Sequence, residues 1–458
     1  MIRFYSFAAA LLAALCLPAC SSMAGSDTNP DTPGADLPSP KGGPLIDSFT
    51  AESSVVFVGT STQLTAVFTG DRATVDLIGP VQSGGAVDTG SLAKTTTFTL
   101  TVQQGADSVQ AQLTVQANYQ NRVRRLADAP VGQAGNLAMA LPDGTAIVMG
   151  GNASIFPRVP DSLVTQFFDP STETFSTGPD LAFSVVAHEF SEAAPLANGS
   201  FVIAEGGINT RRRQSQLYDP IARTFSTVGD LNVFHLPPAQ ATALNDGSVL
   251  LTGRPEIFAP KSGHWTRIAD MVVNRRGHSA TLLNDGTVLI VGGFSCCTPT
   301  GEFPTGAAEI FDPVAQTFSL TGSLATPRAV HAATLLVDGR VLITGGIVDQ
   351  DASTSAAEIF DPSTGEFGPA GNLQFARNAH SAILLTDGRV LIVGGEGSTP
   401  FIGVEATEIF DPSSGTFSLG PSVSPAFFTS TATLLANGKV LIFGGQDPFP
   451  VSAAFIFE

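Results

Sequence analysis

The sequence predicts an all-β protein in which a small β-sandwich precedes seven copies of a four-stranded unit closed into a ring. The composition, with 47 glycines, 31 prolines and 14% charged residues, is typical of strands joined by tight turns. Short alternating apolar segments recur where a helical protein would show a period of 3.6 residues. From residue 118 onward one pattern of turn, glycine and aromatic positions repeats seven times. Such units bury their apolar faces by stacking on one another.

Length and charge narrow the classes of protein. A chain of 458 residues exceeds one ordinary domain, so several folded units or one large repeat assembly are expected. Forty acidic residues against 22 Lys and Arg give a formal charge of −18. Phosphate backbones and anionic bilayers would be repelled, so we expect no nucleic-acid partner. The simplest role of the dispersed acidity is to keep a lysine-poor surface soluble.

The N-terminus has the pattern of an export signal. Arg3 precedes an apolar run over residues 4–17, which is too short to span a bilayer and typical of a signal peptide over residues 1–19. The run ends in Leu-Pro-Ala-Cys at 17–20, which resembles the bacterial lipobox. The resemblance implies cleavage before Cys20 and attachment of diacylglycerol to its thiol. The alternative is ordinary secretion with a chance cysteine at this place.

The segment after Cys20 predicts where the protein resides. Ser21 and Ser22 follow the cysteine, and the absence of an adjacent Asp resembles the sorting rule for the outer membrane of Gram-negative bacteria. Residues 20–44 are rich in Ser, Pro, Gly and Asp, so we expect a disordered tether. The lipid would be the one membrane contact, on the periplasmic or the surface face.

Residues 45–117 predict a separate small β-domain. The segments SSVVFVG, TQLTAVF, TTTFTLTV and SVQAQLTV alternate apolar and polar residues, as half-buried antiparallel strands do. Their size and order resemble bacterial immunoglobulin-like modules, which lack the antibody disulfide, and this range contains no cysteine. The resemblance implies an immunoglobulin-like β-sandwich that acts as a spacer. A carbohydrate-binding role is the alternative.

The repeat is clearest in three consecutive copies. HSATLLNDGTVLIVGG covers 278–293, HAATLLVDGRVLITGG covers 331–346 and HSAILLTDGRVLIVGG covers 380–395. Each continues through a variable loop into EIFDP, with a second Phe seven residues after the first. Four weaker copies follow the same register around the turn pairs at 143–144, 198–199, 246–247 and 437–438. Together they make seven units.

Each unit is interpreted as four strands. An apolar strand leads to Asp-Gly or Asn-Gly, for which we expect a type I′ turn. The return strand, such as residues 288–291, is apolar on both faces, as expected between two packed sheets. The glycine pair that follows allows close backbone approach between neighbouring sheets. EIFDP forms the third strand, and the fourth carries the second aromatic.

This pattern of double glycine and spaced aromatics resembles the kelch repeat, with Phe in place of most of the usual Tyr and Trp. The resemblance implies a seven-bladed kelch-type β-propeller over residues 118–458. The last copy stops at Phe457-Glu458, one strand short. Residues 121–128 (NRVRRLAD) are expected to supply that strand, which would close the ring and remove exposed sheet edges.

The best-known enzymes with kelch propellers are the copper radical oxidases, galactose oxidase and its relatives. They need a Cys crosslinked to a Tyr, a second Tyr and two His as copper ligands. This chain has only Tyr5, Tyr119 and Tyr218. Tyr5 lies in the signal, Tyr119 precedes the first repeat, and Tyr218 holds a structural aromatic position. The sequence therefore supports no copper-radical site, and we expect no metal or other cofactor.

An Arg-x-x-His stretch recurs in three adjacent units. It comprises Arg275 with His278, Arg328 with His331, and Arg377 with His380. In kelch proteins a similar stretch lies beside the central channel. We expect structural histidines, because residues in successive sheets spread around a ring and do not converge on one metal. The three arginines could grip a carboxylate at the channel mouth, or they could pair with the repeated Glu or Asp of neighbouring strands.

Two loops carry further candidates. Arg211, Arg212 and Arg213 follow the second glycine pair and form either a ligand contact or a solvated loop tip. Cys296 and Cys297 are adjacent in the loop after Gly292-Gly293. A vicinal disulfide is one interpretation, because an exported protein meets oxidants. Two free thiols or a soft-metal contact are the alternatives.

The sequence thus predicts a monomeric, non-catalytic recognition protein that binds a protein or a glycan through the loop face of its propeller. The first alternative is a carbohydrate-active enzyme that uses acidic residues at the channel mouth. That chemistry needs two carboxylates at catalytic separation, and the sequence identifies no such pair. The second alternative is a structural envelope protein without a specific ligand. A propeller fold alone implies no substrate.

Overall fold

The computed structural model describes residues 43–132, 135–151, 163–183, 191–205, 213–235, 239–298, 301–349, 352–399, 402–425, 430–447 and 449–458. Every regular element within these ranges is a β-strand, which confirms the all-β expectation. None of these residues forms a helix that is long and apolar enough to cross a bilayer. The signal sequence, Cys20 and most of the expected tether lie outside the described residues.

The first part of the described chain forms two sheets. The smaller sheet contains β1 (Leu45–Ala51), β3 (Gln63–Thr69) and β6 (Ala86–Asp88). The larger sheet contains, in spatial order, β2 (Val55–Phe57), β8 (Asp107–Asn118), β7 (Thr96–Gln104), β4 (Arg72–Val75) and β5 (Gly79–Val81). Leu64 of one sheet and Phe98 and Leu100 of the other belong to one buried cluster. The alternation expected for residues 45–117 is therefore that of strands with one buried face.

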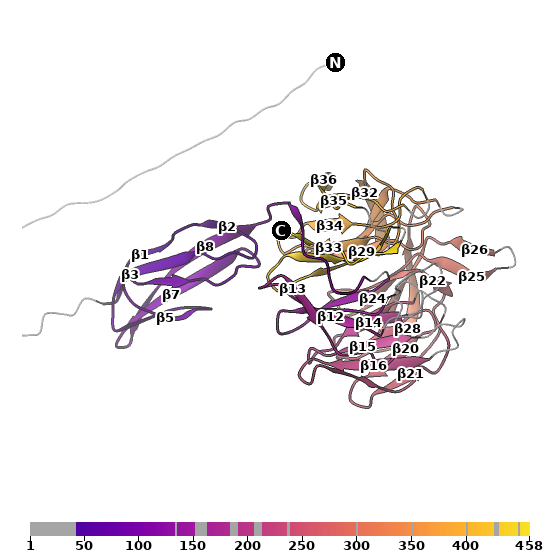
Figure 1. Cartoon of the computed structure of the whole chain (residues 1–458), viewed down its shortest axis with the longest axis horizontal. Helices are drawn as coiled ribbons and strands as arrows, with labels where there is room; N and C mark the ends of the chain where they lie inside the picture. Colours follow the sequence, from indigo (N-terminus) through magenta and orange to yellow (C-terminus); the bar gives the residue numbers. More distant parts are fainter. Residues whose placement is uncertain are drawn as a thin grey trace, which may run out of the picture. The chain divides into compact units, whose positions relative to one another are not determined.

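Seven four-stranded antiparallel sheets follow (Figure 1). Sheet 1 contains β10 (Leu137–Ala140), β11 (Ala146–Met149), β12 (Thr165–Asp169) and β13 (Thr174–Thr177). Sheet 2 contains β14 (Ser191–Pro195), β15 (Phe201–Glu205), β16 (Gln214–Asp219) and β17 (Thr224–Thr227). Sheet 3 contains β18 (Ala241–Ala243), β19 (Val249–Leu251), β20 (Glu256–Ala259) and β21 (His264–Arg267).

The remaining sheets continue the pattern. Sheet 4 contains β23 (Ser279–Leu282), β24 (Val288–Val291), β27 (Ala307–Asp312) and β28 (Thr317–Ser323). Sheet 5 contains β29 (Ala332–Leu335), β30 (Val341–Thr344), β31 (Ala356–Asp361) and β32 (Glu366–Asn372). Sheet 6 contains β33 (Ser381–Leu384), β34 (Val390–Val393), β35 (Ala406–Asp411) and β36 (Thr416–Ser422). Sheet 7 contains β37 (Thr431–Leu434), β38 (Val440–Phe443), β41 (Ala454–Phe457) and β9 (Val123–Arg125).

Two short additions accompany these sheets. β22 (Arg275–Arg276) pairs with a hairpin made of β25 (Phe294–Thr298) and β26 (Gly301–Pro304). β39 (Gln446–Asp447) pairs with β40 (Phe449–Pro450). The hairpin of β25 and β26 extends away from the seven sheets in Figure 1.

From sheet 2 to sheet 7 the first strands of neighbouring sheets contact one another, and β10 of sheet 1 contacts β37 of sheet 7. Sheets 1 and 2 share a buried cluster that contains Met149 and Ile203. The row of sheets therefore closes on itself in a β-propeller-like fold.

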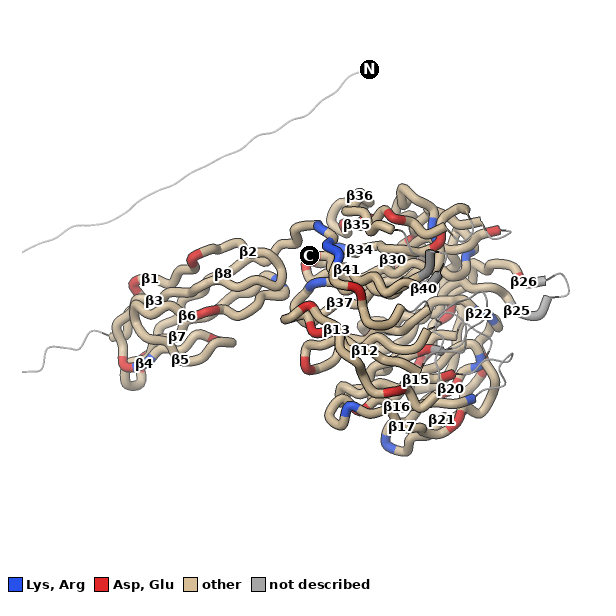
Figure 2. The backbone as a smooth tube through the Cα atoms, in the orientation of Figure 1, with Lys and Arg blue, Asp and Glu red and all other residues tan. Residues whose placement is uncertain are grey.

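Sheet 7 is completed from both ends of the repeat region, as the sequence predicts. β41 pairs with β9 through Phe455↔Arg125, Ile456↔Arg124 and Phe457↔Val123. The blue Lys and Arg residues are sparse in Figure 2, and a small group of them lies beside β41. Arg122 forms an ion pair with Glu458, the residue after β41, and Lys439 lies 2.7 Å from the same carboxylate. Burial raises the pKa of Glu458, but the hydrogen bonds from these cationic side chains have the larger effect. The net result is a pKa lowered to about 2.

The second strands form the core because both of their faces are covered. All four residues of β30 are buried. Val341 and Ile343 pack with residues of sheet 4, whereas Leu342 packs with residues of sheet 6. Successive side chains of a strand point to opposite faces, so one apolar strand fills two inter-sheet layers. The paired aromatics of the third and fourth strands also pack together, for example Phe311 and Phe318 with ring centroids 4.8 Å apart.

The turns at Asp-Gly differ from the expected type I′ geometry. Type I′ needs a positive φ at both central residues, but at Asp143-Gly144 only Gly144 has one, at 88°. Gly144 donates its N–H to the carbonyl of Leu141, and Leu141 donates to the carbonyl of Thr145. This is a three-residue loop that ends in a glycine bulge. The Asp143 carboxylate accepts the backbone N–H of Thr145 at 3.0 Å, which explains why Asp or Asn precedes the glycine.

The glycine pairs lie where the backbone of one sheet packs closely against the next unit. Gly292 and Gly293 have φ angles of 60° and 96°, which side chains rarely adopt. A Cβ on Gly292 would lie 2.5 Å from the Arg328 carbonyl oxygen and 2.8 Å from Cε1 of His331. The glycine pair of one unit thus packs against the Arg-x-x-His stretch of the next unit. This contact explains why the two motifs recur together in the sequence.

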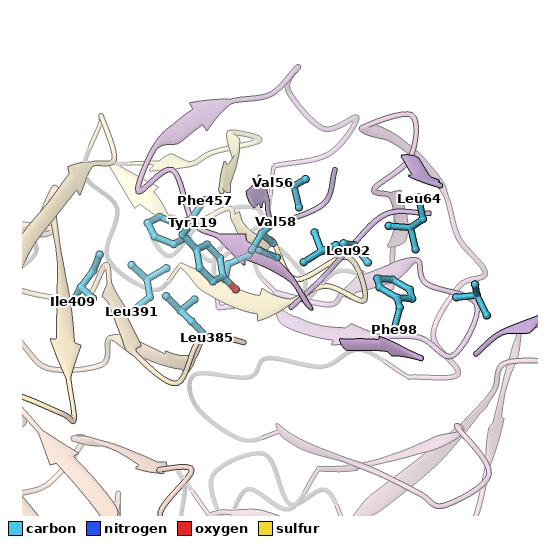
Figure 3. Packing of buried hydrophobic residues seen from close by; sticks show 14 of the residues in the cluster. Val56, Val58, Leu64, Leu92, Phe98, Tyr119, Leu385, Leu391, Ile409 and Phe457 are labelled. Carbon is cyan, nitrogen blue, oxygen red and sulfur yellow. The ribbon is translucent and has the colours of Figure 1, made fainter. Parts of the chain in front are cut away.

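One buried cluster contains residues from the first part of the chain and from the last sheets (Figure 3). It includes Val58 and Leu92 together with Leu385 and Phe457. The Tyr119 ring lies 5.5 Å from the Phe457 ring, and its hydroxyl donates to the Gly438 carbonyl at 2.5 Å. Burial raises the pKa of this phenol, so Tyr119 stays protonated and serves as a donor.

Candidate functional site

A cavity of about 350 Å³ lies where the first strands of the seven sheets begin. Every sheet contributes to its lining, and the contributing residues include Leu137, Glu192, Gln240, His278, His331, His380 and Thr431. Seven strand ends can line one cavity only if they converge around a common axis. The cavity is therefore axial, and it is called the axial cavity below.

Strand pairing determines which loops share this side of the molecule. In sheet 4 the first residue of β23, Ser279, lies opposite Val291 at the end of β24. The start of each first strand therefore adjoins the glycine pair and the loop that follows it. The connections from one sheet to the next enter on the same side. This side, defined by the starts of the first strands and the ends of the second strands, is the loop face.

One position of the repeat forms much of the cavity lining. It lies six residues before the Asp or Asn of the turn, at the start of the first strand. The seven residues at this position are Leu137, Glu192, Gln240, Ser279, Ala332, Ser381 and Thr431. Apart from Ser279 and Ala332, all of them line the cavity. Glu192 is the one ionisable residue at this position.

Glu192 is a carboxyl group without a partner among the described residues. It is half-buried on β14, where its backbone pairs with Ala204. Desolvation by the surrounding protein raises its pKa to about 8. No hydrogen bond or ion pair reaches Glu192 from any residue that the structure describes. At neutral pH the group is therefore mostly protonated and presents a neutral carboxyl to the cavity.

The three histidines line the same cavity but are tied to the framework. Nε2 of His278 shares a hydrogen bond with the Thr252 hydroxyl at 2.6 Å, and Nε2 of His380 shares one with Thr344 at 2.8 Å. His331 contacts the Ser279 hydroxyl at 2.9 Å in the same way.

Burial, reinforced by the neighbouring arginines, lowers the pKa of His278 and His331 to about 3 and that of His380 well below its usual value. All three rings are neutral at physiological pH. Within the described ranges, no cluster of three or more His, Cys, Asp or Glu is placed to hold a metal ion.

The recurring arginines lie inside the protein, beside the cavity wall. Arg275, Arg328 and Arg377 are each 0% exposed. Each pairs with the Glu of the EIF strand in its own unit, as in the 2.8 Å contact between Arg328 Nη2 and Glu358 Oε1.

The same guanidiniums donate to backbone carbonyls, for Arg328 those of Gly345 at 2.9 Å and Ala356 at 2.5 Å. These positions fit the ion-pairing alternative and not the gripping of a ligand, because no guanidinium surface is exposed. The carboxylates also accept backbone N–H groups of the connection between sheets, such as Ala325 to Glu358 at 2.8 Å.

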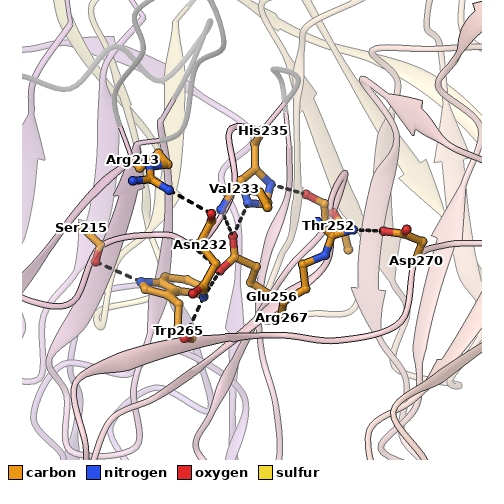
Figure 4. A network of polar contacts seen from close by, with 10 residues as sticks. All are labelled: Arg213, Ser215, Asn232, Val233, His235, Thr252, Glu256, Trp265, Arg267 and Asp270. Atoms are coloured by element: carbon orange, nitrogen blue, oxygen red, sulfur yellow. Dashed lines mark hydrogen bonds and ion pairs between the residues drawn. The ribbon is translucent and has the colours of Figure 1, made fainter.

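In sheet 3 a His–Glu pair takes the place of the Arg–Glu pair (Figure 4). His235 is 2% exposed and lies 3.2 Å from Glu256, which occupies the EIF position. Asn232 donates its side-chain and backbone N–H groups to the same carboxylate at 2.7 and 2.8 Å. Burial opposes ionisation of Glu256, but these hydrogen bonds outweigh it and lower its pKa. In sheets 1 and 2 neutral Gln166 and Gln216 take the corresponding position and bond the loop backbone.

The structure describes some of the remaining candidates, which are the arginines at 211–213 and the two adjacent cysteines. Arg213 donates to the Asn232 carbonyl at 2.9 Å, and its guanidinium lies 5.4 Å from the centre of the Phe234 ring. Arg211 and Arg212 lie outside the described residues. The backbone of Cys296 and Cys297 belongs to β25, but their side chains lie outside the described set, so the disulfide hypothesis stays a prediction.

Sequence reasoning missed Glu192. Its signal was present in the repeat alignment, where an acid stands in a position otherwise held by Leu, Gln, Ser, Ala or Thr. The weak second repeat obscured that register. The His235–Glu256 pair was missed for a related reason, since a histidine replaces the arginine of the stronger repeats.

Comparison with known proteins shows the fold alone. No protein-family model matches the chain, and no curated protein does. Among solved structures, the chain resembles a fungal alcohol oxidase described as catalytically diverse within the AA5 family and in complex with copper. The TM-score is 0.58 and the identity 16%, over 74% of this chain and 75% of that chain. At this identity the likeness establishes a shared propeller-like fold and no activity.

The residues present here do not fit a copper-radical centre. No tyrosine or cysteine is among the described residues that line the axial cavity. Tyr119 bonds Gly438 in the turn between β37 and β38, at the end of the ring opposite the loop face. Tyr218 is buried between Phe201 and Phe225, in the core between sheets.

Proposed function

We propose that this chain is a lipid-anchored, non-catalytic recognition protein that binds a glycan or a protein through the loop face of a seven-bladed kelch-type propeller. The observation that carries the proposal is the axial cavity, to which all seven sheets contribute. Its lining combines hydroxyl, amide and carboxyl groups with small apolar residues. Concave sites with a few convergent polar groups are typical of ligand binding.

The buried polar network supports recognition over catalysis. The arginines and glutamates that recur beside the cavity hold the connections between sheets in place. The histidines are neutral, and their Nε2 atoms bond hydroxyls. A rigid framework with variable loops on one face is the arrangement by which many scaffolds present binding residues.

The remaining parts fit this role. Lipid at Cys20 would anchor the chain to the outer membrane, and residues 20–44 would act as a tether. The immunoglobulin-like module over residues 45–117 would serve as a spacer that holds the propeller away from the bilayer.

A carbohydrate-active enzyme is the second candidate, and Glu192 favours it. A carboxyl group with a pKa of about 8 is protonated at neutral pH, as a general acid requires. Glycoside hydrolysis also needs a second carboxylate. Glu192 is the one carboxylate among the described residues that line the cavity, so recognition is the better supported function.

Two measurements on the mature chain test the proposal. A glycan array and affinity capture from envelope extracts should retain a defined sugar or one protein. A Ser430→Trp variant, which fills the cavity, should lose that retention. Ser413→Trp, placed on the exposed turn between β35 and β36, should keep it. Turnover of a sugar panel would favour the enzyme, and no retention by any partner would leave a structural role.

A further inference from the structure

The described lining of the axial cavity contains one carboxyl group, that of Glu192. Glu192 is half-buried in the cavity wall and has no hydrogen-bond partner among the described residues. The framework glutamates of sheets 3 to 6 are all paired with a buried His or Arg. A cationic ligand in the cavity would therefore supply the partner that the described protein residues do not give Glu192.

The described groups around Glu192 include no cation. His278, His331 and His380 are neutral near pH 7, because burial lowers their pKa values. The described lining contains no Lys or Arg. Glu205 on the paired strand β15 lies opposite Ser191 and not opposite Glu192, so its side chain projects from the other face of the sheet. The cavity thus offers a carboxyl group without a counter-ion.

The rest of the lining indicates the body of the ligand. Gln240, Ser381, Ser430 and Thr431 supply amide and hydroxyl groups that can donate and accept hydrogen bonds. Such a surface suits a polyhydroxylated molecule better than an aliphatic chain. The volume of about 350 Å³ lies in the range of small-molecule sites and accommodates one sugar residue.

We propose that the axial cavity binds an amino sugar, with Glu192 as the counter-ion of its ammonium group and the neighbouring amide and hydroxyl side chains bonding its hydroxyls. This deepens the proposed function and rests on it, because it names the chemistry of the ligand held at the loop face. On binding, the Glu192 carboxyl releases its proton to solvent and an ion pair forms. No covalent bond is made or broken in the ligand.

Calorimetry of the mature chain at pH 6.5 with three matched sugars tests the proposal. D-glucosamine, D-glucose and N-acetyl-D-glucosamine differ only at C2, as ammonium, hydroxyl and amide. Glucosamine should bind at least about tenfold more tightly than the other two. Repeating the titration in two buffers of different ionisation enthalpy should show release of close to one proton per glucosamine bound.

Two variants test whether the preference for glucosamine depends on Glu192. Glu192→Gln keeps the shape and removes the charge, so glucosamine affinity should fall to that of glucose and proton release should cease. Glu302→Gln makes the same change on the exposed β26 hairpin, where Glu302 pairs with Arg276, and should leave both readouts unchanged. Circular dichroism and thermal melting verify folding of each variant.

Equal affinity for glucose and glucosamine, retention of the preference in Glu192→Gln, or no binding of any of the three sugars would each overturn the amino-sugar proposal. The proposed function fails separately. If a neutral glycan or a protein is still captured and Ser430→Trp abolishes that capture, recognition at the loop face stands without the amino sugar.

Discussion

Replacing Arg328 with methionine tests whether the recurring Arg–Glu pairs hold the sheets together. The guanidinium is 0% exposed and donates to Glu358 at 2.8 Å and to three backbone carbonyls. Removing one partner of a buried ion pair typically costs about 3–5 kcal/mol, because the other charge stays buried. The N–H groups of Ala325 and Thr326 still bond Glu358, which reduces the free-energy cost of leaving its carboxylate without the arginine. We expect destabilisation by about 4 kcal/mol.

Urea unfolding followed by circular dichroism and by the fluorescence of Trp265, the single tryptophan, measures this loss. Arg340→Met is the matched control in the same sheet, because Arg340 pairs with Asp338 at the surface, with side chains 36% and 46% exposed. An exposed pair contributes at most about 1 kcal/mol.

The double variant Arg328→Met/Glu358→Gln should recover part of the loss, since Gln166 bonds the corresponding backbone in sheet 1 without a charge. A stability for Arg328→Met within about 1 kcal/mol of that for Arg340→Met would refute the structural role of the pair.

Three further predictions concern packing and pH. Gly292→Ala should lower stability by about 2 kcal/mol or more, because its Cβ would lie 2.5 Å from the Arg328 carbonyl oxygen at a positive φ; Gly368→Ala, with open space around it, should change the urea midpoint little. The Glu458 pKa is lowered from 4.5 to about 2, so its stabilisation of about 3 kcal/mol is present above pH 4.5 and is lost as the pH falls towards 2. Acid unfolding of Glu458→Gln should lack that component, and an unchanged acid profile would contradict the assignment. The Glu192 pKa is raised from 4.5 to about 8, so the folded state binds the proton more tightly and wild-type stability falls as the pH rises from 4.5 to 8. Melting temperatures of Glu192→Gln should not show this fall, and parallel profiles for both proteins would exclude it.

Much of the propeller-like fold could be predicted because its signals are local and repeated. The apolar return strands, such as residues 288–291, are buried on both faces, as expected. The missing strand of the last sheet is supplied near Arg124, also as expected. Each unit repeats the same turn, glycine and aromatic positions, so errors in one copy are corrected by the others. The prediction of a type I′ turn at Asp143-Gly144 was wrong. The residue pair alone does not distinguish a two-residue loop from a three-residue loop with a bulge.

The candidate site depended on tertiary structure. By itself, the sequence determined which residues form strands and which positions recur, since period-two patterns and turn residues act within a few residues of one another. Tertiary structure decided that Glu192 lies unpartnered in an axial cavity and that Arg275, Arg328 and Arg377 are enclosed and paired. Burial and charge partners arise when seven strand starts from distant parts of the chain converge on one axis, and no local pattern records that convergence.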